Sequence, residues 1–168
     1  MNYDNNRHNA HNEIDHIFQD LFPTRNMAER PEQAALCHRM LDAMVEGGIA
    51  LCDAGTGIGK TYAYLVAGTV YSRFRTACGL ERKPILVSTS SIALQTAARD
   101  EYLPLLSDVL TEDGMIVQPL QAVIRKGKSH YVCDMRLEQR LGQLDLQKKN
   151  WKAGAALLSL RGQLDMDE

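Results

Sequence analysis

The stretch CDAGTGIGKTYAYL, residues 52–65, decides which fold the sequence predicts. Its glycine-rich part, residues 54–61, fits the relaxed phosphate-loop pattern of Ala or Gly, four residues, and then Gly-Lys-Ser/Thr. Glycines allow the backbone to turn tightly, so that successive N–H groups point inward at phosphate oxygens. A helix that begins here directs its positive end at the same anion. The stretch therefore predicts a nucleotide-binding loop.

The side chains of this loop have predicted tasks. Lys60 supplies positive charge to the β- and γ-phosphates of ATP, and the Thr61 hydroxyl can ligate Mg²⁺, so these two are the candidate catalytic residues. The competing interpretation is a glycine-rich turn with a solvated lysine, but an apolar run before the loop and an amphipathic pattern after it favour nucleotide binding. The candidate ATP-binding residues of the loop are Ala54, Gly55, Thr56, Gly57, Ile58, Gly59, Lys60 and Thr61.

Short apolar runs near the loop are typical of buried strands. IALCD, residues 49–53, precedes the loop, and PILVST, residues 84–89, follows a predicted helix from Lys60 to about Phe74. A third strand is predicted to end near Arg125. Strands that alternate with helices indicate an α/β domain with a parallel sheet. We therefore expect a P-loop NTPase (RecA-like) fold, with a parallel sheet that is flanked by helices and incomplete in this chain.

Other segments are predicted to be helical, polar or disordered. Apolar residues recur at helical spacing over 13–22, over a segment that begins at Pro31 and stops at the pair Gly47-Gly48, and over 134–151. Ser90 or Ser91 is expected to cap a further helix. Residues 108–114 are expected to form a polar turn region, and the polar residues 1–12 a disordered lead-in.

Composition excludes several classes of protein. Hydrophobic residues make up 45% and charged residues 24% of the 168 residues, which is ordinary for a globular domain. No stretch approaches 18 consecutive apolar residues, so a membrane span is not predicted. The four cysteines form no CxxC pair, which argues against a structural zinc site built within this chain. Reduced thiols are typical of a cytoplasmic protein.

Two segments resemble a helicase family. AGTGIGKT followed by the aromatic-rich YAYLV resembles the DinG/XPD-like branch of superfamily 2 DNA helicases, which usually have Glu where Asp53 stands and often Thr where Ile58 stands. RPEQ, residues 30–33, resembles the upstream Arg-x-x-Gln element of that family. The resemblance implies that Arg30 and Gln33 belong to the ATP site and that Gln33 recognises adenine. An amide suits this task because it can donate and accept together; the alternative is an ordinary exposed pair near a helix start.

A later segment resembles the family's DNA-binding motif Ia. It reads LVSTSSIALQTAARDEYLPLL and would deliver short hydroxyl side chains to a DNA backbone. The resemblance implies DNA contacts by Ser88, Thr89 and Ser90, which would position DNA without reading its sequence. A helix cap would explain one of these hydroxyl groups but not three.

The segment VIRKGKSHYVCDMRL, residues 123–137, resembles the family's Lys-Gly-Arg/Lys-x-x-Tyr-x-Cys element. The cysteine of that element is the first of four ligands to a 4Fe–4S cluster, which implies this role for Cys133. Residues 121–152 contain eight Lys or Arg against three Asp or Glu, which suits a single-stranded DNA channel that includes Lys126 and Lys128. An ordinary half-buried thiol is the alternative for Cys133.

The resemblance implies an ATP-dependent DNA helicase that moves 5′ to 3′ on single-stranded DNA. The expected partners are single-stranded or forked DNA and the remainder of a helicase chain, with no membrane. Residues 1–12 would be a lead-in, 13–122 the N-terminal part of motor domain 1, and 123–168 the start of an iron–sulfur insertion.

The sequence contains no Walker B carboxylates after the loop and no cysteine after Cys133. We therefore expect a fragment that binds nucleotide weakly, hydrolyses none and assembles no cluster. Two alternatives stay open at this point: a short nucleotide- or DNA-binding regulatory protein without turnover, and a different P-loop NTPase.

Overall fold

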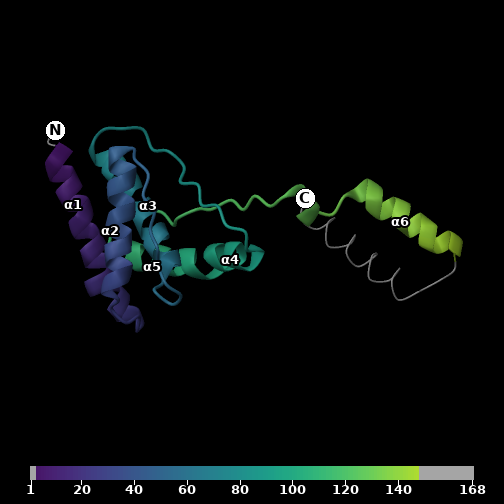
Figure 1. Ribbon diagram of the computed structural model, residues 1–168, viewed down its shortest axis with the longest axis horizontal. Helices are drawn as coiled ribbons and strands as arrows, with labels where there is room; N and C mark the ends of the chain where they lie inside the picture. Colours follow the sequence, from purple (N-terminus) through teal and green to yellow (C-terminus); the bar gives the residue numbers. More distant parts are fainter. Residues whose placement is uncertain (1–2, 148–168) are drawn as a thin grey trace. The chain divides into compact units, whose positions relative to one another are not determined.

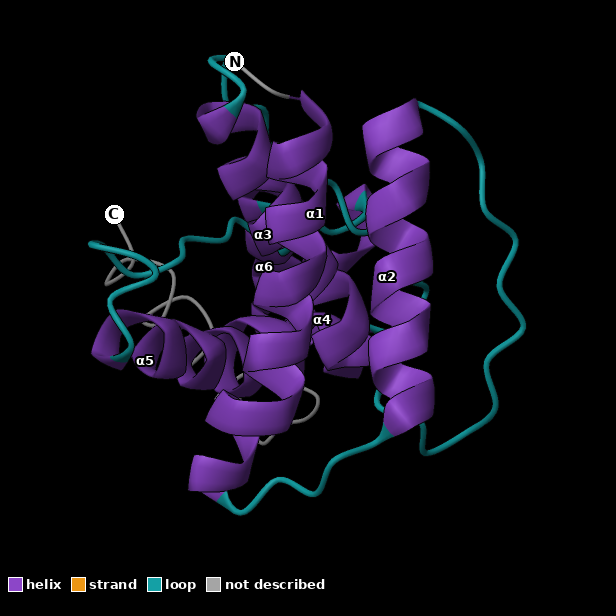
Figure 2. Ribbon diagram, turned by 90° about the vertical axis from the view of Figure 1, so that its left-hand side faces the viewer, coloured by secondary structure: helices purple, strands orange, loops and turns teal. Residues whose placement is uncertain are grey.

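The computed structural model describes residues 3–147, and all regular elements in this range are helical (Figure 2). The chain divides into two compact units, Met1–Ile124 and Arg125–Glu168, which are described separately. The α-helices are α1 (Tyr3–His16), α2 (Pro31–Glu46), α3 (Lys60–Ala77), α4 (Ile92–Ala97), α5 (Leu103–Glu112) and α6 (Asp134–Gln147). π-Helical turns span Ile17–Leu21 and Ala98–Tyr102, and 3₁₀ turns span Phe22–Arg25 and Lys128–His130.

Helices α1, α2 and α3 pack against one another in the first unit (Figure 1). The Tyr3 hydroxyl donates to the carbonyl of Val45 over 3.2 Å, and the Asn6 amide donates to the carbonyl of Ala77 over 3.2 Å. The N-terminus of α1 therefore lies beside the C-terminal ends of both α2 and α3. It follows that α2 and α3 run in the same direction, so that the first turns of both helices lie at the same end of the bundle.

The core of this unit joins the three helices to the π-helical turn after α1 and to α5. Burial of a large apolar side chain contributes about 1.5–3 kcal/mol, so these contacts hold α3 in place. The buried apolar residues are Ala10, Ile14, Ile17, Phe18, Phe22, Leu36, Cys37, Leu41, Ala63, Val66, Ala67, Val70, Phe74, Leu106, Val109 and Leu110.

The predicted parallel sheet of a RecA-like P-loop fold is wrong for this chain. Residues 49–53, 84–89 and 121–125 have no strand partner among residues 3–147, and the side chains of Ile49, Leu51 and Leu86 are more than nine-tenths exposed. A helix satisfies its own backbone groups, whereas a strand needs a neighbour for its N–H and C=O groups. An apolar run favours burial but does not supply that neighbour. The described part of the chain is helical instead.

Two polar segments are more ordered than their composition indicates. Residues 3–12, expected to be disordered, form most of α1, because Arg7 pairs with Asp42 at 2.6 Å and with Glu46 at 2.7 Å on α2. Residues 108–112, expected to lie in a polar turn, belong to α5, where Val109 and Leu110 are buried. In both segments a few contacts on one face stabilise the helix.

Helix boundaries that depend on local chemistry are confirmed. α2 begins with Pro31 and ends at Gly47, which adopts a left-handed φ of 66°. α4 is capped by Ser91, whose hydroxyl accepts a hydrogen bond from the N–H of Leu94. α3 begins at Lys60 as predicted. Residues 148–151, which end the predicted C-terminal helix, lie outside the described residues.

None of the helices among residues 3–147 combines the length and the hydrophobicity that are needed to cross a bilayer.

Candidate nucleotide-binding site

The glycine-rich loop enters α3 through two glycines with left-handed backbone angles. Gly57 has a φ of 85° and Gly59 a φ of 89°, a region that L side chains rarely adopt. Gly59 is the N-cap of α3, and its carbonyl accepts the first hydrogen bond of the helix from the N–H of Ala63 over 3.3 Å. The loop therefore faces the positive end of an 18-residue helix, where an anion is stabilised.

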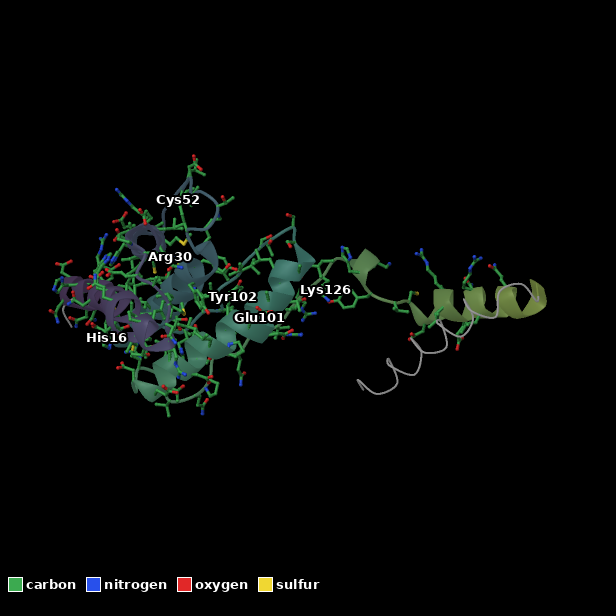
Figure 3. The ribbon with its side chains drawn as sticks, turned by 90° about the horizontal axis from the view of Figure 1, so that it is seen from below. His16, Arg30, Cys52, Glu101, Tyr102 and Lys126 are labelled. Atoms are coloured by element: carbon green, nitrogen blue, oxygen red, sulfur yellow. The ribbon has the colours of Figure 1, made fainter. Side chains whose placement is uncertain are left out.

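The start of α2 holds this loop through two side chains. The guanidinium of Arg30, labelled in Figure 3, donates to the carbonyl of Gly57 over 2.5 Å. The Nε2 of Gln33 donates to the carbonyl of Gly59 over 2.6 Å. A Cβ atom on Gly59 would lie 2.1 Å from this same Nε2, so the contact requires glycine at position 59.

Lys60 is exposed, and its ammonium group folds back over the loop. It donates to the carbonyls of Ala54, over 3.0 Å, and Gly55, over 2.7 Å. A phosphate oxygen is a stronger partner for an ammonium group than a carbonyl, because both groups are charged. Residues 54–61 carry no acidic side chain, so this set of N–H donors and one cation suits a triphosphate. The half-buried Thr61 lies in the first turn of α3.

The structure brings the predicted upstream element and the loop together across 26 residues of sequence. Arg30 and Gln33 both contact loop carbonyls, so both residues lie directly beside the loop. The Gln33 side chain is only 5% exposed and faces the loop backbone. Its hydrogen bond to the loop was not predicted from the sequence.

The three predicted DNA-binding hydroxyls lie just before α4. The Thr89 hydroxyl accepts a hydrogen bond from the N–H of Ser91 over 3.2 Å, and its carbonyl accepts one from the Gln95 amide over 3.5 Å. Ser88 and Ser90 are exposed. Because Ser91 is the cap of α4, none of the three predicted hydroxyls is occupied in capping that helix.

The second unit contains the remaining predicted residues. The N–H of Lys126 donates to the Tyr131 hydroxyl over 3.1 Å, and Lys128 opens a 3₁₀ turn. Cys133 is exposed, and its carbonyl accepts from the N–H of Leu137 over 2.9 Å at the start of α6. Within residues 3–147 no three His, Cys, Asp or Glu side chains are grouped to hold a metal ion. The described residues therefore supply Cys133 as a single thiol and do not complete a cluster site.

A row of aromatic rings connects the N-terminal end of α3 to the 3₁₀ turn after α1 and to the π-helical turn before α5. The ring of Tyr62 meets Phe22 at 5.0 Å and Tyr102 at 5.2 Å between centroids, both edge to face. Burial, with smaller contributions from Tyr102 and Glu101, raises the pKa of Tyr62. Figure 3 labels Glu101 and Tyr102 next to each other. Tyr62 belongs to the aromatic-rich YAYLV segment, but its contacts with Phe22 and Tyr102 were not predicted from the sequence.

A second cluster that the sequence did not indicate joins α1 and α2. The Nδ1 atoms of His11 and His38 lie 2.8 Å apart, and their Nε2 atoms face Asp42 at 3.1 Å and Asp15 at 2.9 Å. The cluster therefore links α1 to α2 through side-chain contacts.

Comparisons with known proteins relate the chain to helicases. It is 32% identical over 117 residues to "3'-5' exonuclease DinG" from Bacillus subtilis, which is 70% of this chain and 11% of that protein. It is 36% identical over 110 residues to "ATP-dependent helicase DinG" from Mycobacterium tuberculosis, and 32% identical over 111 residues to "ATP-dependent DNA helicase YoaA" from Escherichia coli. Each of the latter two matches covers 66% of this chain and 15% of the relative.

No model of a protein family matches the chain, and no solved structure matches it. The chain spans between 11% and 15% of the length of these three relatives. Over about two thirds of its own length, it is a homologue of one segment of the DinG-like helicases.

Proposed function

We propose that this chain is the nucleotide-binding segment of an ATP-dependent DNA helicase that moves 5′ to 3′ along single-stranded DNA in the cytoplasm. The observation that carries the proposal is the phosphate loop, which opens at the start of α3 and is held by Arg30 and Gln33 from α2. In this proposal residues 13–122 belong to the first motor domain, and residues 123–168 begin an iron–sulfur insertion. Relatives named ATP-dependent helicases support it.

The triphosphate of ATP would lie against the N–H groups of residues 54–61. Lys60 would exchange its two carbonyl partners for the β- and γ-phosphates, and Thr61 would ligate Mg²⁺. Mg²⁺ held there would supply positive charge to offset the negative charge of the phosphate oxygens. Arg30 and Gln33 would complete the site on its α2 side.

Single-stranded or forked DNA would contact two groups of residues. Ser88, Thr89 and Ser90 carry hydroxyls suited to backbone phosphates, and the exposure of Ser88 and Ser90 supports this role. Lys126 and Lys128 would add positive charge along the strand.

Cys133 would be the first thiolate ligand of a 4Fe–4S cluster in the intact helicase. Its exposure supports this role because the thiol is accessible to a cluster whose other iron atoms would be bound by cysteines from other parts of a longer chain. Replacement Cys133→Ser is expected to remove the brown absorbance and bound iron of the purified intact protein. Full retention of iron would contradict the assignment.

The experiment that tests the helicase proposal measures ATP hydrolysis by the intact protein with and without single-stranded DNA. We expect DNA to stimulate hydrolysis, Lys60→Ala to abolish it, and the exposed control Lys83→Ala to leave it unchanged. A rate of ATP hydrolysis that is the same with and without DNA would favour a different P-loop NTPase. Nucleotide binding without any turnover would favour the regulatory protein.

A further inference from the structure

We infer that the ring of Tyr131 stacks on a base of single-stranded DNA, beside the cationic side chains of residues 125–128. The inference rests on the proposed function, because it assumes that this segment contacts DNA. It deepens that function by adding a contact to a base, whereas Lys126 and Lys128 are assigned to the phosphates of the strand.

Positive charge is concentrated in the residues just before Tyr131. Residues 125–131 read RKGKSHY and contain Arg125, Lys126 and Lys128 without any acidic side chain. Lys128 is exposed at the start of the 3₁₀ turn, and Lys126 is labelled in Figure 3. A surface with this charge attracts the phosphates of a single strand, whatever its sequence. Contacts to phosphates leave the bases of that strand without a partner, and an aromatic ring supplies one.

The ring of Tyr131 is open to such a ligand. The residue is 56% exposed, and within residues 3–147 its ring contacts no other aromatic ring and no guanidinium group. Tyr3 is also exposed, but its ring packs edge to face against Phe74 at 5.3 Å between centroids. Every base has a π face, so an exposed ring that lacks an aromatic partner can stack on any of them.

The hydroxyl of Tyr131 holds the ring in place before a ligand arrives. It accepts a hydrogen bond from the N–H of Lys126 over 3.1 Å, which closes residues 126–131 into a loop. Inside this loop the N–H of His130 donates to the carbonyl of Gly127 over 2.9 Å, and the N–H of Tyr131 donates to the carbonyl of Lys128 over 3.3 Å. A side chain that is already held loses less conformational freedom on binding, so these contacts favour stacking.

A purely structural role for Tyr131 depends on a different part of the same side chain. Closing the loop needs the hydroxyl, whereas stacking needs the ring. A structural role also affects every ligand of the loop equally, whereas stacking increases affinity only for ligands that carry bases. Variants that separate the hydroxyl from the ring, and ligands that separate bases from phosphates, therefore distinguish the two roles.

Fluorescence anisotropy titration of the 168-residue chain compares two labelled ligands, an oligothymidylate and an abasic deoxyribose-phosphate oligomer of the same length. Both carry the same number of phosphates, but only the first carries bases. We expect the unaltered chain to bind the oligothymidylate about tenfold more tightly, as for stacking of one base. Tyr131→Leu should remove this preference because it removes the ring. Tyr131→Phe should keep the preference because it removes only the hydroxyl.

Two further variants separate charge and neighbouring surface from stacking. Lys128→Ala should weaken both ligands equally and reduce the slope of log affinity against log salt concentration by about 0.7, the value for one phosphate contact on a single strand. Val132→Ala shortens the exposed side chain next to Tyr131 and should stay within about twofold of the unaltered chain for both ligands.

Three results would overturn the inference and leave the phosphate contacts standing: equal binding of both ligands by the unaltered chain, a preference that survives in Tyr131→Leu, or a preference that is lost in Tyr131→Phe. Failure of the unaltered chain to bind either ligand would overturn both the inference and the DNA contacts proposed for Lys126 and Lys128.

Discussion

Gly59 shows how a single residue of the loop meets two requirements at once. Its φ of 89° disfavours any side chain, and the amide of Gln33 occupies the space where a Cβ would stand. We expect Gly59→Ala to lower the free energy of unfolding by about 1–3 kcal/mol, the usual cost of a residue held in an unfavourable backbone region. It should also weaken tripolyphosphate binding, because the contact with Gln33 is displaced.

Gly48→Ala is the matched control for this change, because a Cβ there meets no atom within 4 Å and its φ is not in the left-handed region. Chemical denaturation and calorimetric titration measure the two effects. Equal stability and equal ligand affinity in Gly59→Ala and Gly48→Ala would contradict the role of Gly59.

Local chemistry explains which site residues were predictable. The loop pattern predicts the tight turns at Gly57 and Gly59, because positive φ depends mainly on the residue itself. The family resemblance predicted that Arg30 and Gln33 lie near the loop. Their hydrogen bonds to loop carbonyls depend on how α2 packs beside α3, which no local pattern encodes.

At the scale of elements, helices were predicted better than strands for a physical reason. The pattern that begins at Pro31 and stops at Gly47 gives α2, because a helix forms its hydrogen bonds within one segment. The runs at 49–53 and 84–89 are as apolar as strands, but they have no paired neighbour among residues 3–147. The predicted sheet failed for this reason, since pairing depends on segments that are distant in sequence.

His16 connects the end of α1 to α5 and makes stability depend on pH. Its Nδ1 lies 2.8 Å from Asp20 and its Nε2 lies 3.2 Å from Asp113, and these hydrogen bonds raise its pKa. The folded state therefore favours the proton. The stabilisation is present below the unfolded pKa of about 6.5 and is lost as pH rises through the higher folded value.

We expect His16→Gln to destabilise the protein at about pH 6 and to have less effect at about pH 8. The difference should stay below about 1 kcal/mol, because the pairs are partly exposed. Urea unfolding at both pH values measures it, and Asp113→Asn should show part of the same pH dependence. A difference that grows with rising pH would contradict the assignment.

Tyr62 is the central ring of the aromatic row at the start of α3, and we expect its ring contacts to stabilise the fold. Tyr62 contacts both Phe22 and Tyr102, so we expect Tyr62→Ala to cost about 1–3 kcal/mol, less than for a fully buried ring. Tyr62→Phe keeps both ring contacts and is expected to stay near the unaltered stability. Thermal unfolding compares the two variants. Equal losses in both would show that the hydroxyl, and not the ring, matters.

For the first unit as a whole, polar contacts add to the apolar core that holds α1 against the other helices. Arg73 on α3 donates to both carboxylate oxygens of Glu13 over 2.8 Å, and this contact raises the pKa of Arg73. Glu13→Gln removes the charge of a partly buried pair, and we expect it to lower the free energy of unfolding by about 1–2 kcal/mol. The exposed control Glu29→Gln should have no comparable effect in urea unfolding. Equal effects would contradict the role of this pair.

We propose above that residues 54–61, beside the starts of α2 and α3, bind the triphosphate of a nucleotide. Titration of the 168-residue chain with Mg²⁺–ATP, beside its Lys60→Ala variant, tests this most directly. We expect saturable binding at one site in the unaltered chain and loss of that binding in the variant, while circular dichroism shows the same helical content in both. Equal ATP binding by two folded chains, or no binding by either, would contradict it.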